Sequence, residues 1–144
     1  MDRHESEHIE YAPFEVEEHL SDVLTLCEAA GWESFRQSPE LARRSLTAPG
    51  VCTMVALRRR AVIGFAQMQG DGVLQAHLTL IAVDERFRRE GIGRRLVEEA
   101  ALRCGARRVD LISSREGEVF YESFAHRSRA GFRIYPSSEE GEVG

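Results

Sequence analysis

Three strand-like segments joined by short turns constrain the fold more than any other feature of this 144-residue sequence. The first two, VCTMVAL (51–57) and AVIGFAQMQ (61–69), are strongly apolar and are separated only by Arg58 to Arg60. Asp71-Gly72, a dipeptide typical of hairpin turns, leads into the third segment, VLQAHLTLIAV (73–83). Because such short connections join antiparallel neighbours, the pattern predicts a three-stranded meander.

Helical and strand patterns flank this meander, without internal repeats. Apolar residues recur at helical spacing in the segment Val16, Leu20, Val23, Leu24 and Cys27, which predicts a helix. Ser38 and Pro39 are suited to be the cap and the first residue of a further short helix. A later helix begins at Ile92, stops at Gly105 and shows one apolar face: Ile92, Leu96, Val97, Ala100 and Cys104. We also expect strands at 8–12, 108–113 and 131–135, and a short helix at 116–124.

Composition limits the class of protein. A hydrophobic content of 42%, with 30% charged residues, is ordinary for a folded domain. No apolar run approaches the roughly 20 residues of a membrane helix, and the polar start MDRHESEHIE is unlike a secretory signal. The three scattered cysteines predict neither a disulfide framework nor a metal site, which favours a reduced, cytoplasmic protein. The net charge of −5 argues against nucleic-acid binding.

The segment FRREGIGRRL (87–96) concentrates positive charge in this acidic chain. Five of the ten residues from Arg86 to Arg95 are arginine, and the segment lies between a predicted strand and a predicted helix. A helix N-terminus attracts phosphate through unpaired N–H groups, glycine allows close backbone approach, and arginine adds charge-assisted hydrogen bonds. The pattern therefore favours a pyrophosphate-bearing ligand. A glycine-rich turn beside a solvated arginine face is the alternative interpretation.

Two familiar nucleotide-binding motifs do not fit this segment. A P-loop ends in Gly-Lys-Ser/Thr, which the sequence lacks. The dinucleotide fingerprint requires a third glycine, where this chain has Leu96, and it opens the first βαβ unit rather than following an antiparallel meander. Both interpretations fail.

The longer segment LIAVDERFRREGIGRRLVEEAL resembles the acyl-CoA-binding region of the GNAT superfamily of N-acetyltransferases. Its signature, Arg/Gln-x-x-Gly-x-Gly/Ala, is filled by Arg88, Gly91 and Gly93. VFYESF and the later GFRIYP are similar to the Phe-Tyr and Gly-Phe pairs of that family, and the order of elements also matches over residues 8–136.

This resemblance implies an α/β (α+β) fold in which a mixed, mostly antiparallel central sheet is flanked by helices on both faces. It implies a single domain over 6–136, followed by an acidic tail at 137–144 that we expect to be disordered. Acetyl-CoA is the implied co-substrate, with no metal. Its pyrophosphate would be held by Arg88, Arg89, Glu90, Gly91, Ile92, Gly93 and Arg94, and its pantetheine arm by the main chain of Ile81, Ala82 and Val83.

The resemblance also implies two proton-transfer groups. Tyr121 matches the tyrosine that protonates the departing thiolate, although a core tyrosine is the alternative. His77 lies where family members often carry the base. Alternation along the strand places Gln75, His77, Thr79 and Ile81 on one face, so His77 would share a face with residues lining the cofactor unless a bulge intervenes. A structural histidine is the alternative.

Two departures from the family pattern concern the region around Tyr121. ESFAHRSRA separates the Phe-Tyr pair from Gly-Phe by more than the usual few residues, and SSREGE offers no asparagine where the family often has one. Trp32 and Phe35 fall in a region that commonly walls the acceptor pocket, and they are equally suited to cap the core.

The sequence therefore predicts an acetyl-CoA-dependent N-acetyltransferase that acts on a primary amine by direct attack. A non-catalytic acyl-CoA sensor and a transferase of longer acyl groups remain alternatives. The sequence does not identify the amine. The resemblance also allows a homodimer.

Overall fold

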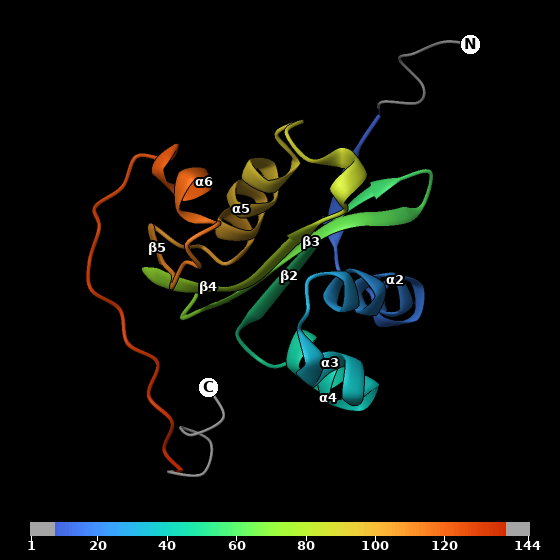
Figure 1. The fold of residues 1–144 in the computed structure, drawn as a ribbon, viewed down its shortest axis with the longest axis horizontal. Helices are drawn as coiled ribbons and strands as arrows, with labels where there is room; N and C mark the ends of the chain where they lie inside the picture. Colours follow the sequence, from blue (N-terminus) through green and yellow to red (C-terminus); the bar gives the residue numbers. More distant parts are fainter. Residues whose placement is uncertain (1–7, 138–144) are drawn as a thin grey trace. The chain divides into compact units, whose positions relative to one another are not determined.

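The structure, a computed structural model, describes residues 8–137 (Figure 1). The chain divides into two units, Met1–Asp110 and Leu111–Gly144, which are treated separately below. Residues 6 and 7 of the predicted domain lie outside the described residues, as does the predicted tail apart from Ser137. A single domain over 6–136 stays a prediction.

The first unit contains a five-stranded sheet in the order β1-β2-β3-β4-β5. Its strands are β1 (Glu10–Pro13), β2 (Val51–Arg58), β3 (Ala61–Gly70), β4 (Gln75–Val83) and β5 (Arg108–Asp110). The first four pair antiparallel, whereas β5 runs parallel to β4. The predicted meander of three strands is therefore confirmed. Its first turn is tight, because Arg59 and Arg60 both adopt positive φ, 51° and 69°.

Helices cover both faces of the sheet (Figure 1). One face carries α2 (Val16–Ala29), α3 (Glu33–Gln37) and α4 (Pro39–Leu46), and the other carries α5 (Ile92–Arg103). The Ser38 hydroxyl accepts a hydrogen bond from the backbone N–H of Leu41 at 3.2 Å, so the predicted cap of α4 is present. The expected fold class, a mostly antiparallel sheet between helical layers, is confirmed.

The core on the α2 face is built around Phe65 of β3, which is completely buried among Val23 and Cys27 of α2, Leu46 of α4 and Val55 of β2. Two residues along β3, Gln67 is also fully buried, and its Nε2 donates to the backbone oxygen and hydroxyl of Ser45 on α4, both at 3.0 Å. Odd-numbered residues of β3 from 65 to 69 therefore face α2 and α4.

The opposite face of the sheet receives α5 at close range, because β3 presents small residues there. A Cβ added to Gly64 would lie 3.1 Å from Cδ1 of Leu96, and one added to Gly70 would lie 3.5 Å from Sγ of Cys104. The apolar face predicted for this helix is buried as expected: Ile92, Leu96, Val97, Ala100 and Cys104. The two glycines therefore let α5 approach the backbone of β3 closely at Leu96 and at Cys104.

A β-bulge in β4 interrupts the alternation of side chains that was predicted for this strand. Gln67 pairs with Leu80 and Met68 pairs with Leu78, so Thr79 is an extra residue opposite β3. The insertion shifts the alternation by one residue. Leu80 turns to the α2 face, where it packs on the core, and Ile81 turns to the α5 face. The prediction that His77 and Ile81 share a face is therefore wrong, and the bulge is the reason.

In the second unit, residues 111–137 contain one short helix, α6 (Glu118–Glu122), within the predicted helical segment. The strand predicted at 131–135 is not formed: these residues have no regular secondary structure, and Phe132 and Ile134 are each 82% exposed. Their alternating apolar pattern is that of a strand, but a strand requires a neighbour to bond with. No helix in the described part of the chain has the length and apolarity needed to cross a membrane.

Candidate functional site

The loop between β4 and α5 is anchored at its first residue, Asp84. The Asp84 backbone N–H donates to the carbonyl of Ile63 at 2.7 Å, which keeps the loop start against β3. The Asp84 carboxylate accepts from the backbone N–H of Arg86 at 2.9 Å and from its guanidinium at 3.2 and 2.9 Å. These bonds, chiefly those from the guanidinium, hold the pKa of Asp84 below its usual value. A 3₁₀ turn, η1 (Glu85–Phe87), follows.

The loop leads into the N-terminus of α5, which is uncapped. Gly91 is the N-cap of α5 and adopts the left-handed conformation, with φ 81° and ψ 8°. No side chain caps the helix, and its first turn contains no acidic residue. The initial N–H groups of any helix lack intrahelical acceptors, and they point out of its end. In α5 the first intrahelical bond runs from the N–H of Arg95 to the carbonyl of Gly91 at 3.1 Å.

The charge at this helix start is unusual, because Arg94 and Arg95 occupy the first turn. Cations near a helix N-terminus oppose the dipole, at a cost of about 0.3–1 kcal/mol each. Partial compensation comes from within the helix: Arg95 bonds Glu99 at 2.8 Å, and Arg94 lies 3.6 Å from Glu98. An anion placed at the uncapped N–H groups would meet both the dipole and the arginines favourably.

The remaining arginines of the signature loop differ in their roles. Nε of Arg88 donates to the carbonyl of Val83 at 3.4 Å, so this side chain braces the loop against the end of β4. Arg89 is exposed and adopts a positive φ of 67°. Glu90 and Gly91 are also exposed, whereas Ile92 is buried beneath the first turn. Residues 88–91 of the loop are thus exposed between two fixed ends.

The edge of β4 opens next to this loop. The ladder between β4 and β5 has three residue pairs, Gln75–Arg108, Ala76–Val109 and His77–Asp110. Beyond His77, the edge of β4 facing away from β3 has no strand partner in the first unit, as far as the chain is described. In an antiparallel strand, alternate residues direct their N–H and C=O groups to each edge. The predicted cofactor residues Ile81, Ala82 and Val83 lie on this open stretch.

His77 is exposed on the α2 face of the sheet, at the last pair before β4 and β5 part. Across β3 it is paired with Gln69, which is also exposed. The structure therefore places His77 and the open edge of β4 within the same strand, separated by the Thr79 bulge. It does not place the side chains of His77 and Ile81 on one face.

Tyr121 belongs to the second unit, in α6. Its backbone N–H donates to the carbonyl of Gly117 at 3.2 Å, and its ring lies 4.9 Å from that of Phe120 in an edge-on arrangement. Burial raises the pKa of Tyr121 above the ordinary phenol value, so the hydroxyl is protonated at neutral pH. A protonated phenol is the form that a general acid requires.

Trp32 and Phe35, the candidates for the acceptor pocket, are both half-buried against the core. The Trp32 ring meets Phe65 edge-on, with centroids 6.2 Å apart and planes at 88°. The structure thus gives these residues a packing role, and their contact with an acceptor stays a prediction.

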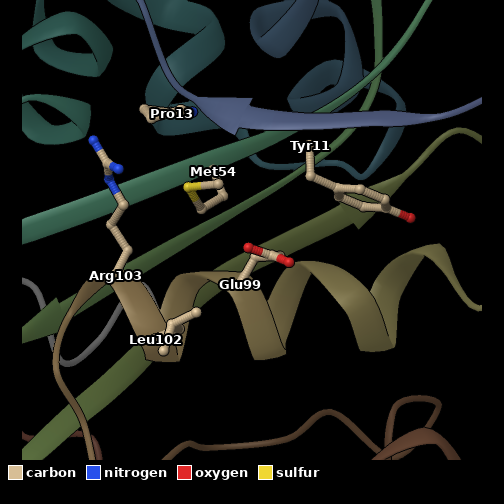
Figure 2. Close-up of a pocket in the computed structure, with 6 residues that line it drawn as sticks. All are labelled: Tyr11, Pro13, Met54, Glu99, Leu102 and Arg103. Atoms are coloured by element: carbon tan, nitrogen blue, oxygen red, sulfur yellow. The ribbon is translucent and has the colours of Figure 1, made fainter.

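A hollow of about 430 Å³ lies elsewhere in the first unit, between α5 and the strands β1 and β2 (Figure 2). None of the predicted site residues lines it; its walls are Tyr11, Pro13, Met54, Glu99, Leu102 and Arg103. The Arg95 guanidinium lies over the Tyr11 ring at 5.1 Å and also bonds Glu99, so the polar groups at one end of the hollow are already engaged.

Sequence comparison identifies the family to which this fold and loop belong. Residues 11–134 match the family model described as an acetyltransferase (GNAT) domain. The chain therefore belongs to the GNAT acetyltransferase family.

Individual relatives agree with this assignment. An uncharacterized N-acetyltransferase of Bacillus subtilis, YitH, is 26% identical over 129 residues. The match covers 83% of this chain but only 41% of YitH. A GNAT-family acetyltransferase structure from Streptococcus pneumoniae is 26% identical with a TM-score of 0.69, covering 90% of this chain and all of that one. The aminoglycoside N-acetyltransferase AAC(6')-Iy, solved with CoA, shares the fold at 20% identity and a TM-score of 0.69, covering 90% of this chain and 96% of its own.

Proposed function

We propose that this protein transfers an acetyl group from acetyl-CoA to a primary amine by direct nucleophilic attack. The observation that carries the proposal is the start of α5, an uncapped helix N-terminus without acidic residues, bordered by Arg94 and Arg95. Together with family membership, this arrangement supports a pyrophosphate-binding role for the loop from Arg88 to Arg94.

The residues of the first unit fit an acyl-CoA molecule at two places. Backbone N–H groups from Arg89 to Arg94 would bind the pyrophosphate, and Gly91 would leave room for close approach, since a Cβ there would contact no protein atom. The open edge of β4 from Ile81 to Val83 would pair with the amide groups of the pantetheine arm. The thioester carbonyl would then lie near the Thr79 bulge, where an unpaired backbone N–H can stabilise the oxyanion.

The chemistry requires two proton movements. His77 accepts a proton from the amine nitrogen as that nitrogen forms a bond to the carbonyl carbon. The C–S bond of the tetrahedral intermediate then breaks, and Tyr121 donates its phenolic proton to the departing thiolate. The products are an N-acetyl amine and free CoA, and solvent exchange returns His77 and Tyr121 to their starting protonation states.

Release of free CoA thiol, measured with a panel of primary amines, tests this proposal directly. We expect release that depends on both acetyl-CoA and an amine. Tight acetyl-CoA binding by calorimetry with no turnover across a broad panel would contradict catalysis and favour the alternative of a sensor, which needs the phosphate loop but no proton-transfer groups. Replacing acetyl-CoA by longer acyl-CoA thioesters in the same assay tests the other alternative.

The variant His77→Gln distinguishes ionisation of the proposed base from ionisation of the amine substrate. With one amine used for both proteins, the rate at limiting amine should rise with pH through an ionisation that the variant lacks. Identical rates and pH profiles would assign His77 a structural role.

A further inference from the structure

We propose that Cys52 of β2 and Cys104, the C-cap of α5, are a modification site: hydrogen peroxide converts the pair into a reversible intramolecular disulfide. The two residues lie far apart in the sequence, and the packing of α5 on the sheet brings them together. Neither belongs to the residues proposed to bind acetyl-CoA or to move protons, so the inference does not depend on the proposed function.

The sheet places Cys52 on the face that α5 covers. Cys52 is directly paired with Met68 of β3, and residues paired across a ladder project from the same face of a sheet. The odd-numbered residues of β3 from 65 to 69 face α2 and α4, so Met68 faces α5, and Cys52 does so with it. Met68 is completely buried there, whereas Cys52 is half-buried.

The end of α5 brings the second thiol to the same place. The Cys104 Sγ donates to the backbone oxygen of Met68 at 3.8 Å. The same sulfur would lie 3.5 Å from a Cβ at Gly70, so the absence of a side chain there leaves room for it. The Cα atoms of paired residues in an antiparallel ladder are only about 4.5–5.5 Å apart. A sulfur in contact with Met68 is therefore within the reach of one side chain from Cys52.

The two thiols also interact directly. Burial raises the pKa of the Cys104 thiol to about 12, and a side-chain hydrogen bond with Cys52 contributes to the increase. A hydrogen bond between two thiols requires both sulfurs to point into the same space. A disulfide has the same first requirement, because cysteines whose side chains point apart cannot be bridged without movement of the backbone.

The third cysteine has no such neighbour. Cys27 of α2 is completely buried in the core around Phe65, on the opposite face of the sheet from α5. Burial raises the pKa of its thiol to about 11. A thiol that is protonated and enclosed by apolar side chains is inert, so Cys27 serves as an internal control.

The difference in burial gives Cys52 and Cys104 different parts in the reaction. Cys52 is open to a small molecule, whereas Cys104 is 5% exposed and keeps its proton at neutral pH. The Cys52 thiolate attacks the peroxide, so that an S–O bond forms and the O–O bond breaks. The product is a sulfenic acid, and the released hydroxide takes up the proton that the thiol lost and becomes water.

The second step closes the disulfide. The Cys104 sulfur attacks the Cys52 sulfur, so that the S–S bond forms and the S–O bond breaks. The Cys104 proton leaves with the hydroxyl group as a second water molecule. The two thiols together lose two electrons and two protons, and the peroxide is reduced to two molecules of water.

The first test counts thiols in the wild type. Protein reduced with dithiothreitol and freed of it is treated with hydrogen peroxide, and free thiols are then measured after denaturation. The count should fall from the three cysteines of the chain to one, and the intact mass should fall by two hydrogen atoms. Peptide mapping should place the bond between Cys52 and Cys104, and dithiothreitol should restore all three thiols. Non-reducing electrophoresis should show a single-chain band.

Three alanine variants, each checked for folding by circular dichroism, complete the test. Cys27→Ala should form the disulfide as the wild type does. Cys52→Ala should keep both of its thiols under the same treatment. Cys104→Ala should stop at the sulfenic acid of Cys52, which dimedone traps. If Cys104→Ala does not fold, the mapped wild-type bond and Cys52→Ala decide the matter.

Three results would overturn the inference. The first is a wild type that keeps all three thiols at a peroxide concentration that oxidises free N-acetylcysteine in the same tube. The second is an intramolecular disulfide that still forms in Cys52→Ala, since it would join Cys104 to Cys27. The third is oxidation that dithiothreitol does not reverse, since it would place Cys52 beyond the sulfenic acid without capture by Cys104.

Discussion

Gly91 offers the sharpest test of the proposed phosphate-binding loop, because the chain contains a matched control. Gly91 and Gly72 adopt nearly the same left-handed conformation, with φ of 81° and 78°, and a Cβ at either would find no atom within 4 Å. Alanine in this conformation costs about 1–2 kcal/mol. The lower entropy of the unfolded alanine chain offsets about 0.4–1 kcal/mol of that.

Gly91→Ala and Gly72→Ala should therefore lower the free energy of unfolding by a similar amount, about 1 kcal/mol. For a chain of this length, that corresponds to a fall in Tm of about 2–4 °C. Neither variant should lose its fold. Circular dichroism during heating measures both effects, and the two variants should unfold at nearly equal temperatures.

Their affinities for CoA should differ. The space beside Gly91 lies at the start of α5, where the pyrophosphate is proposed to bind, whereas Gly72 lies in the turn between β3 and β4. Gly91→Ala should weaken CoA binding by at least tenfold, or about 1.4 kcal/mol. Gly72→Ala should bind CoA like the wild type. Calorimetry well below both melting temperatures measures this, and equal affinities in the two variants would refute the assignment of the loop.

Three further predictions concern catalysis, pH and packing. Tyr121→Phe should lower kcat about 10²- to 10⁴-fold with little change in acetyl-CoA affinity, and near-normal turnover in a CoA-release assay would exclude Tyr121 as the acid. Asp84→Asn should reduce the free energy of unfolding by less than about 1 kcal/mol at neutral pH. Arg86 lowers the pKa of Asp84 in the folded protein. The difference in free energy of unfolding between wild type and variant should therefore be fully present above the unfolded-state pKa of about 3.9, and it should disappear as the pH falls through the lower folded-state pKa. Urea unfolding at a series of pH values measures this difference. Phe65→Ala should cost about 3–5 kcal/mol by the same measurement, because the ring is completely buried, and a cost below about 1 kcal/mol would contradict the described core.

Local sequence patterns predicted the helices and the meander well, because each depends on residues close together in the chain. The apolar face from Ile92 to Cys104 follows from helical spacing alone, and the Ser38 cap follows from one hydroxyl next to Pro39. The loop before α5 was identified in the same way, from glycine and arginine within a few residues.

The bulge at Thr79 could not be predicted, since it depends on register. Threonine is an ordinary strand residue, and only the pairing of Gln67 with Leu80 and of Met68 with Leu78 reveals the extra position. The faces of Leu80 and Ile81 were therefore assigned wrongly. For the same reason the pairing of β4 with β5 could not be predicted, because its register is set by how far α5 carries the chain before β5.

The strand predicted at 131–135 failed for a different reason. The alternation of Phe132 and Ile134 satisfies the sequence criterion for a strand, but a strand also requires a partner, which a local pattern does not specify.

The absence of a side chain at Gly64 has a consequence for the packing of α5 and β4. A Cβ at this position would lie 3.1 Å from Leu96 of α5 and 3.2 Å from the carbonyl oxygen of Ala82 on β4. Gly64 thus lies in close contact with both the helix proposed to hold the phosphates and the strand proposed to hold the thioester arm. A methyl group at position 64 would press on both elements at once, and either the helix or the strand would have to move by a few tenths of an ångström to make room.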